Sequence, residues 1–142
     1  RLGVVRDPGS AGPRCRVLVA EDTPVNQTIV RGFLERDGHH VTMVGDGVQA
    51  LEALAREPFD LVLMDVQMPQ MDGLEATRRL RAREGAEAVV PIVALTANVM
   101  PGDRERYLEA GMNAYLAKPI DRAALRAVLR RFAPESPEAL RA

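Results

Sequence analysis

Side chains that could handle an anionic group follow four short apolar runs of the sequence. Glu21 and Asp22 follow the first run and Asp65 the third, while Thr96 ends the fourth and Lys118 follows the fifth. If these runs are parallel strands, their carboxyl ends meet at one edge of a sheet, where ligands bind in open α/β folds. Three carboxylates at one edge would repel one another, and a hard cation such as Mg²⁺ would relieve the repulsion. With a hydroxyl and an ammonium, such a site could hold the oxygens of a phosphoryl group whose acceptor is a carboxylate.

Each of these residues also has a purely structural interpretation. Asp22 alone would equally suit a helix N-cap. Thr96 would pass for an ordinary residue at a strand end, and Lys118 for a solvated side chain before Pro119. Their joint placement at four strand ends is much harder to explain by structure alone, so we interpret the set as one phosphoryl-binding site.

Five short apolar runs predict the strands that would position these side chains. Their brevity and their content of Val, Ile and Leu are typical of strands buried on both faces of a parallel sheet. The runs lie at residues 16–20, 41–44, 61–64, 92–95 and 114–117.

Amphipathic segments alternate with the runs and predict five helices. Residues 73–83 are rich in helix formers, and residues 101–110 begin with proline and stop before Gly111, which is typical of a helix start and stop. Such alternation indicates an α/β fold, in which right-handed crossovers place helices on both faces of a parallel sheet. The other three helices show apolar stripes: Val25, Ile29, Phe33 and Leu34; Val48, Leu51, Leu54 and Ala55; and Leu125, Val128, Leu129 and Phe132.

Composition narrows the class of protein. The 142 residues suit one domain, and the net charge of −1 does not point to nucleic acid or to an anionic membrane surface. No apolar run approaches the roughly 18 residues that cross a bilayer, and we expect no direct membrane contact. The single cysteine, Cys15, excludes an internal disulfide and fits a reducing cytoplasm, where we interpret it as a strand-edge filler. We therefore expect a cytoplasmic domain that is a monomer or a weak dimer.

The two ends of the chain differ from its middle. Residues 1–14 are rich in Gly and Pro and read as a linker or disordered arm, and residues 133–142, with two prolines, read as a tail or linker. The folded domain is therefore expected at residues 15–132. Because the sequence starts at Arg1 rather than at methionine, we expect a piece of a longer protein.

The motifs at the strand ends resemble those of the receiver domain of response regulators, the CheY-like superfamily. They are VLVAED at residues 17–22, LVLMDVQMP at 61–69, MDG at 71–73, PIVALTA at 91–97 and YLAKP at 115–119. The run AEDTPVNQ at residues 20–27 is most similar to the C-terminal receivers of hybrid sensor histidine kinases. The resemblance covers residues 15–132 and implies a three-layer α-β-α fold, with a five-stranded parallel sheet of flavodoxin-like order 2-1-3-4-5 and five helices.

The resemblance also implies the roles of the acidic residues. Asp65 would be the phosphoacceptor. Mg²⁺ would be bound by Asp22 and Asp65, by the backbone carbonyl of Gln67, and by Glu21 through a water molecule. Glu21 departs slightly from the family pattern, in which Asp is the commoner first acid.

The remaining motif residues match the switch of the family. Lys118 would pair with one phosphoryl oxygen, and Thr96 would hydrogen-bond to another. Tyr115 matches the switch aromatic, which turns inward when the threonine moves toward the phosphoryl group; alternatively it is an ordinary half-buried aromatic at the sheet edge. The Lys118–Pro119 bond would be cis.

By the same resemblance, the domain would accept its phosphoryl group from a histidine kinase or a histidine phosphotransfer protein of a two-component phosphorelay. The domain would catalyse only its own phosphorylation and dephosphorylation, although the parent chain could be a membrane-bound hybrid histidine kinase. The alternative is a phosphorylation-independent interaction module (a pseudo-receiver), but such modules usually lack an acid, the acceptor or the lysine. A phosphatase of the haloacid dehalogenase type would need an acid at Gln67.

Three further features have competing interpretations. Val25 either belongs to a core stripe or lies on a rim where a partner docks. His39 and His40 are interpreted as surface histidines in a turn. The arginines that follow Gly73, namely Arg78, Arg79, Arg81 and Arg83, are interpreted as a solvated face because glutamates lie close by in the sequence.

Overall fold

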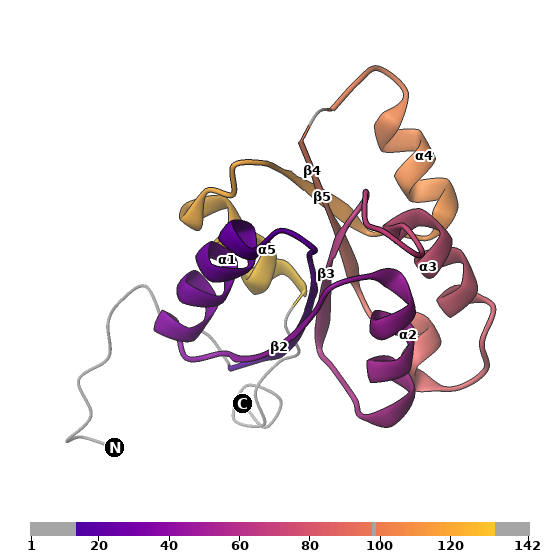
Figure 1. The fold of residues 1–142 in the computed structure, drawn as a ribbon, viewed down its shortest axis with the longest axis horizontal. Coiled ribbons are helices and arrows are strands. Elements are labelled where there is room, and N and C mark those ends of the chain that lie inside the picture. Colours follow the sequence, from indigo (N-terminus) through magenta and orange to yellow (C-terminus); the bar gives the residue numbers. More distant parts are fainter. Residues whose placement is uncertain (1–13, 98, 133–142) are drawn as a thin grey trace, which may run out of the picture.

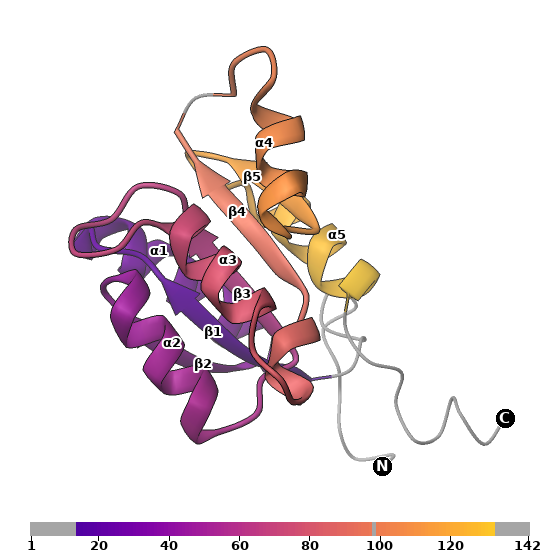
Figure 2. The ribbon, with the colours of Figure 1, turned by 90° about the vertical axis from the view of Figure 1, so that its right-hand side faces the viewer.

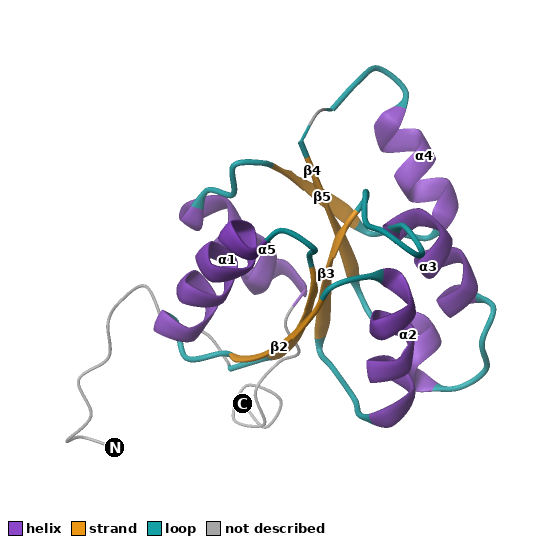
Figure 3. Ribbon diagram, in the orientation of Figure 1, coloured by secondary structure: helices purple, strands orange, loops and turns teal. Residues whose placement is uncertain are grey.

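The structure is a computed structural model that describes residues 14–97 and 99–132, and it has three layers (Figure 1). A five-stranded parallel sheet forms the middle layer, in the order β2-β1-β3-β4-β5, so the predicted order is confirmed. In the described part of the chain, five α-helices cover the two faces of the sheet (Figure 3). The strands are β1 (Arg16–Ala20), β2 (His40–Val44), β3 (Leu61–Asp65), β4 (Ile92–Thr96) and β5 (Ala114–Ala117). The helices are α1 (Pro24–Arg36), α2 (Gly47–Arg56), α3 (Gly73–Arg81), α4 (Asp103–Ala110) and α5 (Arg122–Phe132).

The strands in the centre of the sheet are more deeply buried than the strands at its edges. β3 and β4 are buried along their whole length, and β1 is buried after Arg16, because each has a neighbour on both sides and helices on both faces. β2 and β5 lie at the two edges and are only partly buried. The expectation that all five runs are buried on both faces is therefore wrong for these two edge strands.

Alternate residues of the strands face two separate cores. Leu18, Val62 and Met64 pack with α2, α3 and α4 on one face. Val17 and Leu63 pack with α1 and α5 on the other face. Both views of the ribbon show this division of the helices (Figures 1 and 2). Full burial of one such aliphatic side chain contributes about 1.5–3 kcal/mol, so the two cores fix the sheet edge that carries the site.

The helix ends show where local sequence decides structure. Asp46 and Asp72 cap α2 and α3 by accepting the N–H of Gln49 and of Glu75, respectively. The predicted helix at 101–110 begins later, at Asp103, because Gly102 precedes it with φ +88°, a left-handed conformation that favours glycine. The third helix ends at Arg81 rather than at residue 83, and a short 3₁₀ helix, Ala86–Val89, follows it; no pattern in the sequence predicted this element. None of the described helices is long and apolar enough to span a membrane.

One of the arginines that were predicted to be solvated, Arg81, instead forms hydrogen bonds that join separate elements of the fold. The guanidinium of Arg81 donates to the carbonyls of Ala88, Val90 and Gly111 and to the side chain of Asn113. Partial burial lowers its pKa. Arg81 therefore ties the end of α3 to the 3₁₀ helix and to the turn before β5, and the prediction of a solvated side chain was wrong for this residue.

His39 was also interpreted wrongly as a surface residue. Its ring is half-buried, and Nδ1 accepts the backbone N–H of Cys15 at 3.0 Å. Burial lowers the pKa of His39, although Asp37 acts in the opposite direction. His40 is exposed, as predicted. Cys15 is buried, and burial raises the pKa of its thiol to about 11, which fits a filler rather than a nucleophile.

The predictions that residues 1–14 and 133–142 are linker segments concern residues outside the described part of the chain, apart from Arg14.

Candidate functional site

The carboxyl ends of the strands form a cleft of about 800 Å³. Its lining includes Asp22, Asp65, Thr96 and Lys118, with Tyr107 from α4. Parallel pairing aligns the strand ends, since Ala20 lies opposite Met64, Asp65 opposite Leu95, and Thr96 opposite Ala117. The side chains singled out from the sequence at four strand ends therefore meet at one place.

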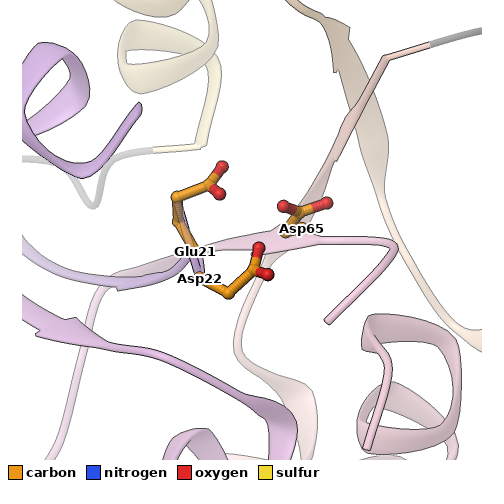
Figure 4. A group of neighbouring side chains, drawn as sticks. All are labelled: Glu21, Asp22 and Asp65. Carbon is orange, nitrogen blue, oxygen red and sulfur yellow. The ribbon is translucent and has the colours of Figure 1, made fainter. Parts of the chain in front are cut away.

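Three carboxylates lie close together at this sheet edge, and two of them, Asp22 and Asp65, line the cleft (Figure 4). Glu21 and Asp22 follow β1, Asp65 ends β3, and one oxygen of each lies within 4.8 Å of the others. Glu21 is 0% exposed and Asp65 is 5% exposed, whereas Asp22 is open to the cleft. Asp22 does not cap the first helix, because the N-cap position is Thr23.

Lys118 bridges two of the carboxylates. Its Nζ donates to Asp65 Oδ2 at 2.8 Å and lies 2.8 Å from Glu21 Oε1. The second oxygen of each acid accepts a backbone N–H, with Thr23 bound to Glu21 at 2.9 Å and Gln67 bound to Asp65 at 3.1 Å. The Lys118–Pro119 peptide bond is cis, as the resemblance implied.

The pKa values of the two buried acids, Glu21 and Asp65, shift in opposite directions. Burial raises the pKa of Asp65 to about 6, and the Glu21 charge acts in the same direction, while Lys118 opposes both. Burial also acts to raise the pKa of Glu21, but Lys118 and the Thr23 N–H outweigh it and hold that pKa below its usual value. Burial acts to lower the pKa of Lys118, yet its carboxylate partners raise it. Near neutral pH the site therefore holds more negative than positive charge.

The donor set fits a hard divalent cation. All the candidate ligands are oxygens, and neither histidine nor cysteine is among them. Glu21 Oε1 is buried and faces the Lys118 ammonium at 2.8 Å. Gln67 lies in the exposed loop after β3 and lines the same cleft, where its backbone carbonyl could complete the set.

The loop after β3 ends at Gly73, which packs against the backbone of Asp65 and Val66. The N–H of Gly73 donates to the carbonyl of Val66 at 3.0 Å, and a Cβ at this position would collide with the backbone carbonyl of Asp65. Only a residue without a side chain lets α3 start so close to Asp65. The sequence placed Gly73 in a motif but did not reveal this contact, because the close approach depends on the fold.

A tyrosine that sequence reasoning missed lies beside Thr96. Tyr107, 3% exposed, donates its hydroxyl to Thr96 Oγ1 at 3.2 Å. Its ring meets that of Tyr115 edge-on, with centroids 6.2 Å apart. Tyr115 itself is 37% exposed at the sheet edge. The spacing of Asp103, Tyr107 and Ala110 could have indicated a buried helix face, but no local signal relates Tyr107 to a strand end eleven residues earlier.

Val25 is exposed rather than part of the core, and it lies two residues after Thr23, which lines the cleft. The side chain is 66% exposed, and α1 packs on the sheet through Val30 and Leu34 instead. Ile29, one turn further along α1, is partly exposed as well. The core-stripe interpretation of Val25 is therefore wrong, and docking of a partner at this position stays a prediction.

The sequence matches a known family over most of its length. The family described as Response regulator receiver domain matches residues 17–130. Among curated proteins, the sensor protein GacS of Pseudomonas syringae pv. syringae is 46% identical over 116 residues, which is 80% of this chain and 13% of that protein. The chain spans between 6% and 15% of the length of relatives of this kind.

Solved structures agree with the sequence comparison. The receiver domain of a sensor histidine kinase of Pseudomonas aeruginosa is 48% identical with a TM-score of 0.77, covering 84% of this chain and 98% of that one, and it holds a magnesium ion in its active site cleft. The Saccharomyces cerevisiae response regulator Ssk1 has a receiver domain crystallised with the histidine phosphotransfer protein Ypd1. That structure is 30% identical with a TM-score of 0.79 and covers 87% of this chain and 91% of that one.

Proposed function

The chain belongs to the response regulator receiver domain family, and from this premise we propose that Asp65 accepts a phosphoryl group from a phosphohistidine of a partner protein. The observation that carries the proposal is the contact between Asp65 and Lys118 in a cleft that Asp22 also lines, with the carboxylate of Glu21 buried beside them. Asp65 is the carboxylate that directly ends β3, and its Oδ1 is oriented by the Gln67 N–H. The acceptor is therefore held in place before a donor arrives.

The transfer step is a nucleophilic displacement at phosphorus. A carboxylate oxygen of Asp65 attacks the phosphorus atom, and a new O–P bond forms as the N–P bond of the phosphohistidine breaks. The electron pair of the broken bond stays on the ring nitrogen, and the ring leaves as neutral imidazole when its other nitrogen carries a proton. The phosphoryl group is later lost by hydrolysis. A water oxygen attacks phosphorus, the O–P bond to Asp65 breaks, and phosphate, a proton and the free carboxylate result.

The chain's own residues neutralise the charge that the phosphoryl group brings. Lys118, which pairs with Asp65 at 2.8 Å, would pair with a phosphoryl oxygen once the group is attached to Asp65. Mg²⁺, when bound, neutralises phosphoryl oxygens, and we assign Asp22, Asp65 and the Gln67 carbonyl as its ligands, with Glu21 acting through water. The acidic cluster of these residues and the magnesium ion of the Pseudomonas aeruginosa receiver support this assignment.

The switch is assigned to Thr96 and Tyr115. The Thr96 hydroxyl lines the cleft near Asp65 and would donate to a second phosphoryl oxygen. Movement of Thr96 opens space behind it for Tyr115, whose half-exposed ring lies at the sheet edge. Phosphorylation is thereby converted into a change of surface at β5.

The partner is a histidine kinase or a histidine phosphotransfer protein, as in the complex of Ypd1 with a receiver. The donor approaches over the N-terminal end of α1, where the exposed Val25 follows Thr23, a residue that lines the cleft. We place the domain at residues 15–132 of a longer, cytoplasmic or membrane-tethered hybrid kinase, in line with the kinases that it resembles. A phosphorylation-independent module is disfavoured, since the two acids, the acceptor and the lysine are all present.

Labelling with a small phosphodonor tests the proposal. Incubation with acetyl phosphate and Mg²⁺ should add one phosphoryl group to the intact protein, detected by mass spectrometry. Asp65→Asn should abolish the addition. Asp60→Asn is a matched control, because Asp60 precedes the same strand at its opposite end, and it should label normally. Unchanged labelling of Asp65→Asn would show that the acceptor is another residue.

A further inference from the structure

Tyr107 makes a contact with the switch that the proposed function does not use. It lies on α4 among core residues, and its ring packs edge-on against Tyr115 at an interplanar angle of 66°. Its hydroxyl reaches across to β4 and bonds Thr96 Oγ1 within a buried environment. One side chain thus contacts both residues that are assigned to the switch.

The hydrogen bond has an energetic consequence for the position of Thr96. A hydroxyl offers one donor and two acceptor sites, so Thr96 can accept from Tyr107 while it stays at the end of β4. Displacement of Thr96 toward a phosphoryl oxygen lengthens or breaks this bond and leaves a buried phenol hydroxyl without that partner. Because an unsatisfied buried donor is costly, the bond favours the present position of Thr96.

We propose that Tyr107 is a positioning residue that holds Thr96 in its unphosphorylated position and so weakens the response of the domain to phosphorylation. The inference rests on the proposed function, because it gives Tyr107 an effect only through Thr96. The edge contact with Tyr115 extends the restraint, since the Tyr107 ring forms part of the surface on which Tyr115 rests. Release of Thr96 and rearrangement of Tyr115 are therefore coupled through α4.

Removal of one oxygen atom tests this restraint. Tyr107→Phe keeps the ring and its packing but lacks the hydroxyl, so the hydrogen bond is lost only from the unliganded state. We expect beryllium fluoride, a mimic of the phosphoryl group, to bind Tyr107→Phe roughly two- to tenfold more tightly than the wild type in the presence of Mg²⁺, which is the effect of one net hydrogen bond. Mg²⁺ affinity without beryllium fluoride should stay the same. The chain has two tyrosines and no tryptophan, so tyrosine fluorescence reports on this cluster in each protein.

A double-mutant cycle separates a positioning role from a merely structural one. Thr96→Val removes the acceptor of the hydrogen bond, so Tyr107→Phe should have no further effect on beryllium fluoride affinity in that background.

The outcomes distinguish this inference from the proposed function. If the wild type binds no beryllium fluoride and takes no phosphoryl group from acetyl phosphate, the proposed function fails. If the wild type responds but Tyr107→Phe binds the mimic equally or more weakly, the restraint by Tyr107 is overturned. An equal gain in the Thr96→Val background would likewise show that Tyr107 does not act through Thr96.

Discussion

The ammonium of Lys118 lies 2.8 Å from the carboxylate of Asp65, although 53 residues separate them in the sequence. Lys118 is also the only lysine of the chain; every other basic side chain apart from the two histidines is arginine. An ammonium is a compact charge on a flexible stem, whereas a guanidinium is a planar fork. A compact charge suits the role that we propose for Lys118, which is to neutralise two carboxylates before phosphorylation and a phosphoryl oxygen afterwards.

Lys118→Met should therefore destabilise the metal-free protein and strengthen its affinity for Mg²⁺. Two buried carboxylates would lose their shared cation, and loss of one partner of a buried ion pair costs about 3 kcal/mol. The same loss removes a cation that competes with Mg²⁺ for these oxygens. Urea unfolding and Mg²⁺ titration measure the two effects. A Lys118→Arg control keeps the charge and should change both quantities less, and weaker Mg²⁺ binding by Lys118→Met would contradict the assignment.

Mg²⁺ should stabilise the wild type by mass action through the acidic cluster. A ligand that binds only the folded state raises the melting temperature as its concentration rises. Glu21→Ala combined with Asp22→Ala removes two of the three carboxylates and should abolish this Mg²⁺-dependent shift. Differential scanning fluorimetry across a Mg²⁺ series measures it. A shift that persists in the double variant would place the metal elsewhere.

Gly73→Ala should displace the backbone of Asp65 and so disturb the site. The new Cβ would collide with the carbonyl of Asp65, and overpacking of this kind costs about 1–3 kcal/mol. We expect a lower unfolding free energy together with slower labelling by acetyl phosphate, because the acceptor strand must shift. Gly32→Ala is the matched control: nothing lies within 4 Å of its Cβ position in the middle of α1. This control should gain up to about 1 kcal/mol of stability from helix propensity.

Asp37 should contribute stability that depends on pH in the acid range. A hydrogen bond from Arg126 lowers the pKa of this carboxyl, burial opposes it, and Arg122 adds to the lowering. Because the folded-state pKa is depressed, the contribution is present above the unfolded pKa of about 3.9 and is lost as pH falls through the folded value. At neutral pH, Asp37→Asn should cost about 2 kcal/mol, the range for hydrogen bonds to charged groups.

Urea unfolding of Asp37→Asn and the wild type over a pH series measures this contribution. The difference between them should shrink as the medium becomes acidic. Glu35→Gln is the control, because its ion pair with Arg31 is exposed and such pairs contribute little. A difference that is constant with pH would mean that the loss arises from packing rather than from charge.

The sequence predicted those parts of the molecule that depend on local pattern. Apolar runs and amphipathic stripes located the strands and helices, and the ends of the runs located Glu21, Asp65 and Lys118, because parallel strands bring their carboxyl ends together. Arg81 and Tyr107 could not be predicted in the same way. Both act through contacts between elements, and a residue's own neighbours in sequence do not reveal which carbonyl or hydroxyl will face it.

Val25 provides a test of the docking rim. The side chain is 66% exposed at the start of α1, two residues after Thr23 of the cleft lining, and it takes no part in the core that anchors α1 through Val30 and Leu34. A histidine-bearing partner must bring its phosphorus close to Asp65, because in-line transfer requires the reacting groups nearly in contact. A charge on an apolar rim should weaken association, whereas acetyl phosphate needs no docking surface.

Val25→Glu should therefore slow transfer from a phosphorylated histidine phosphotransfer protein that labels the wild type, while labelling by acetyl phosphate stays near normal. Val89→Glu is the matched control, since Val89 is 78% exposed and lies in the 3₁₀ helix before β4, away from the lining of the cleft. Both rates should stay near normal in that variant. Comparable transfer by Val25→Glu and Val89→Glu would remove the support for docking at α1. Equal loss of both reactions in Val25→Glu, with a lower melting temperature, would instead show that the substitution damages the fold.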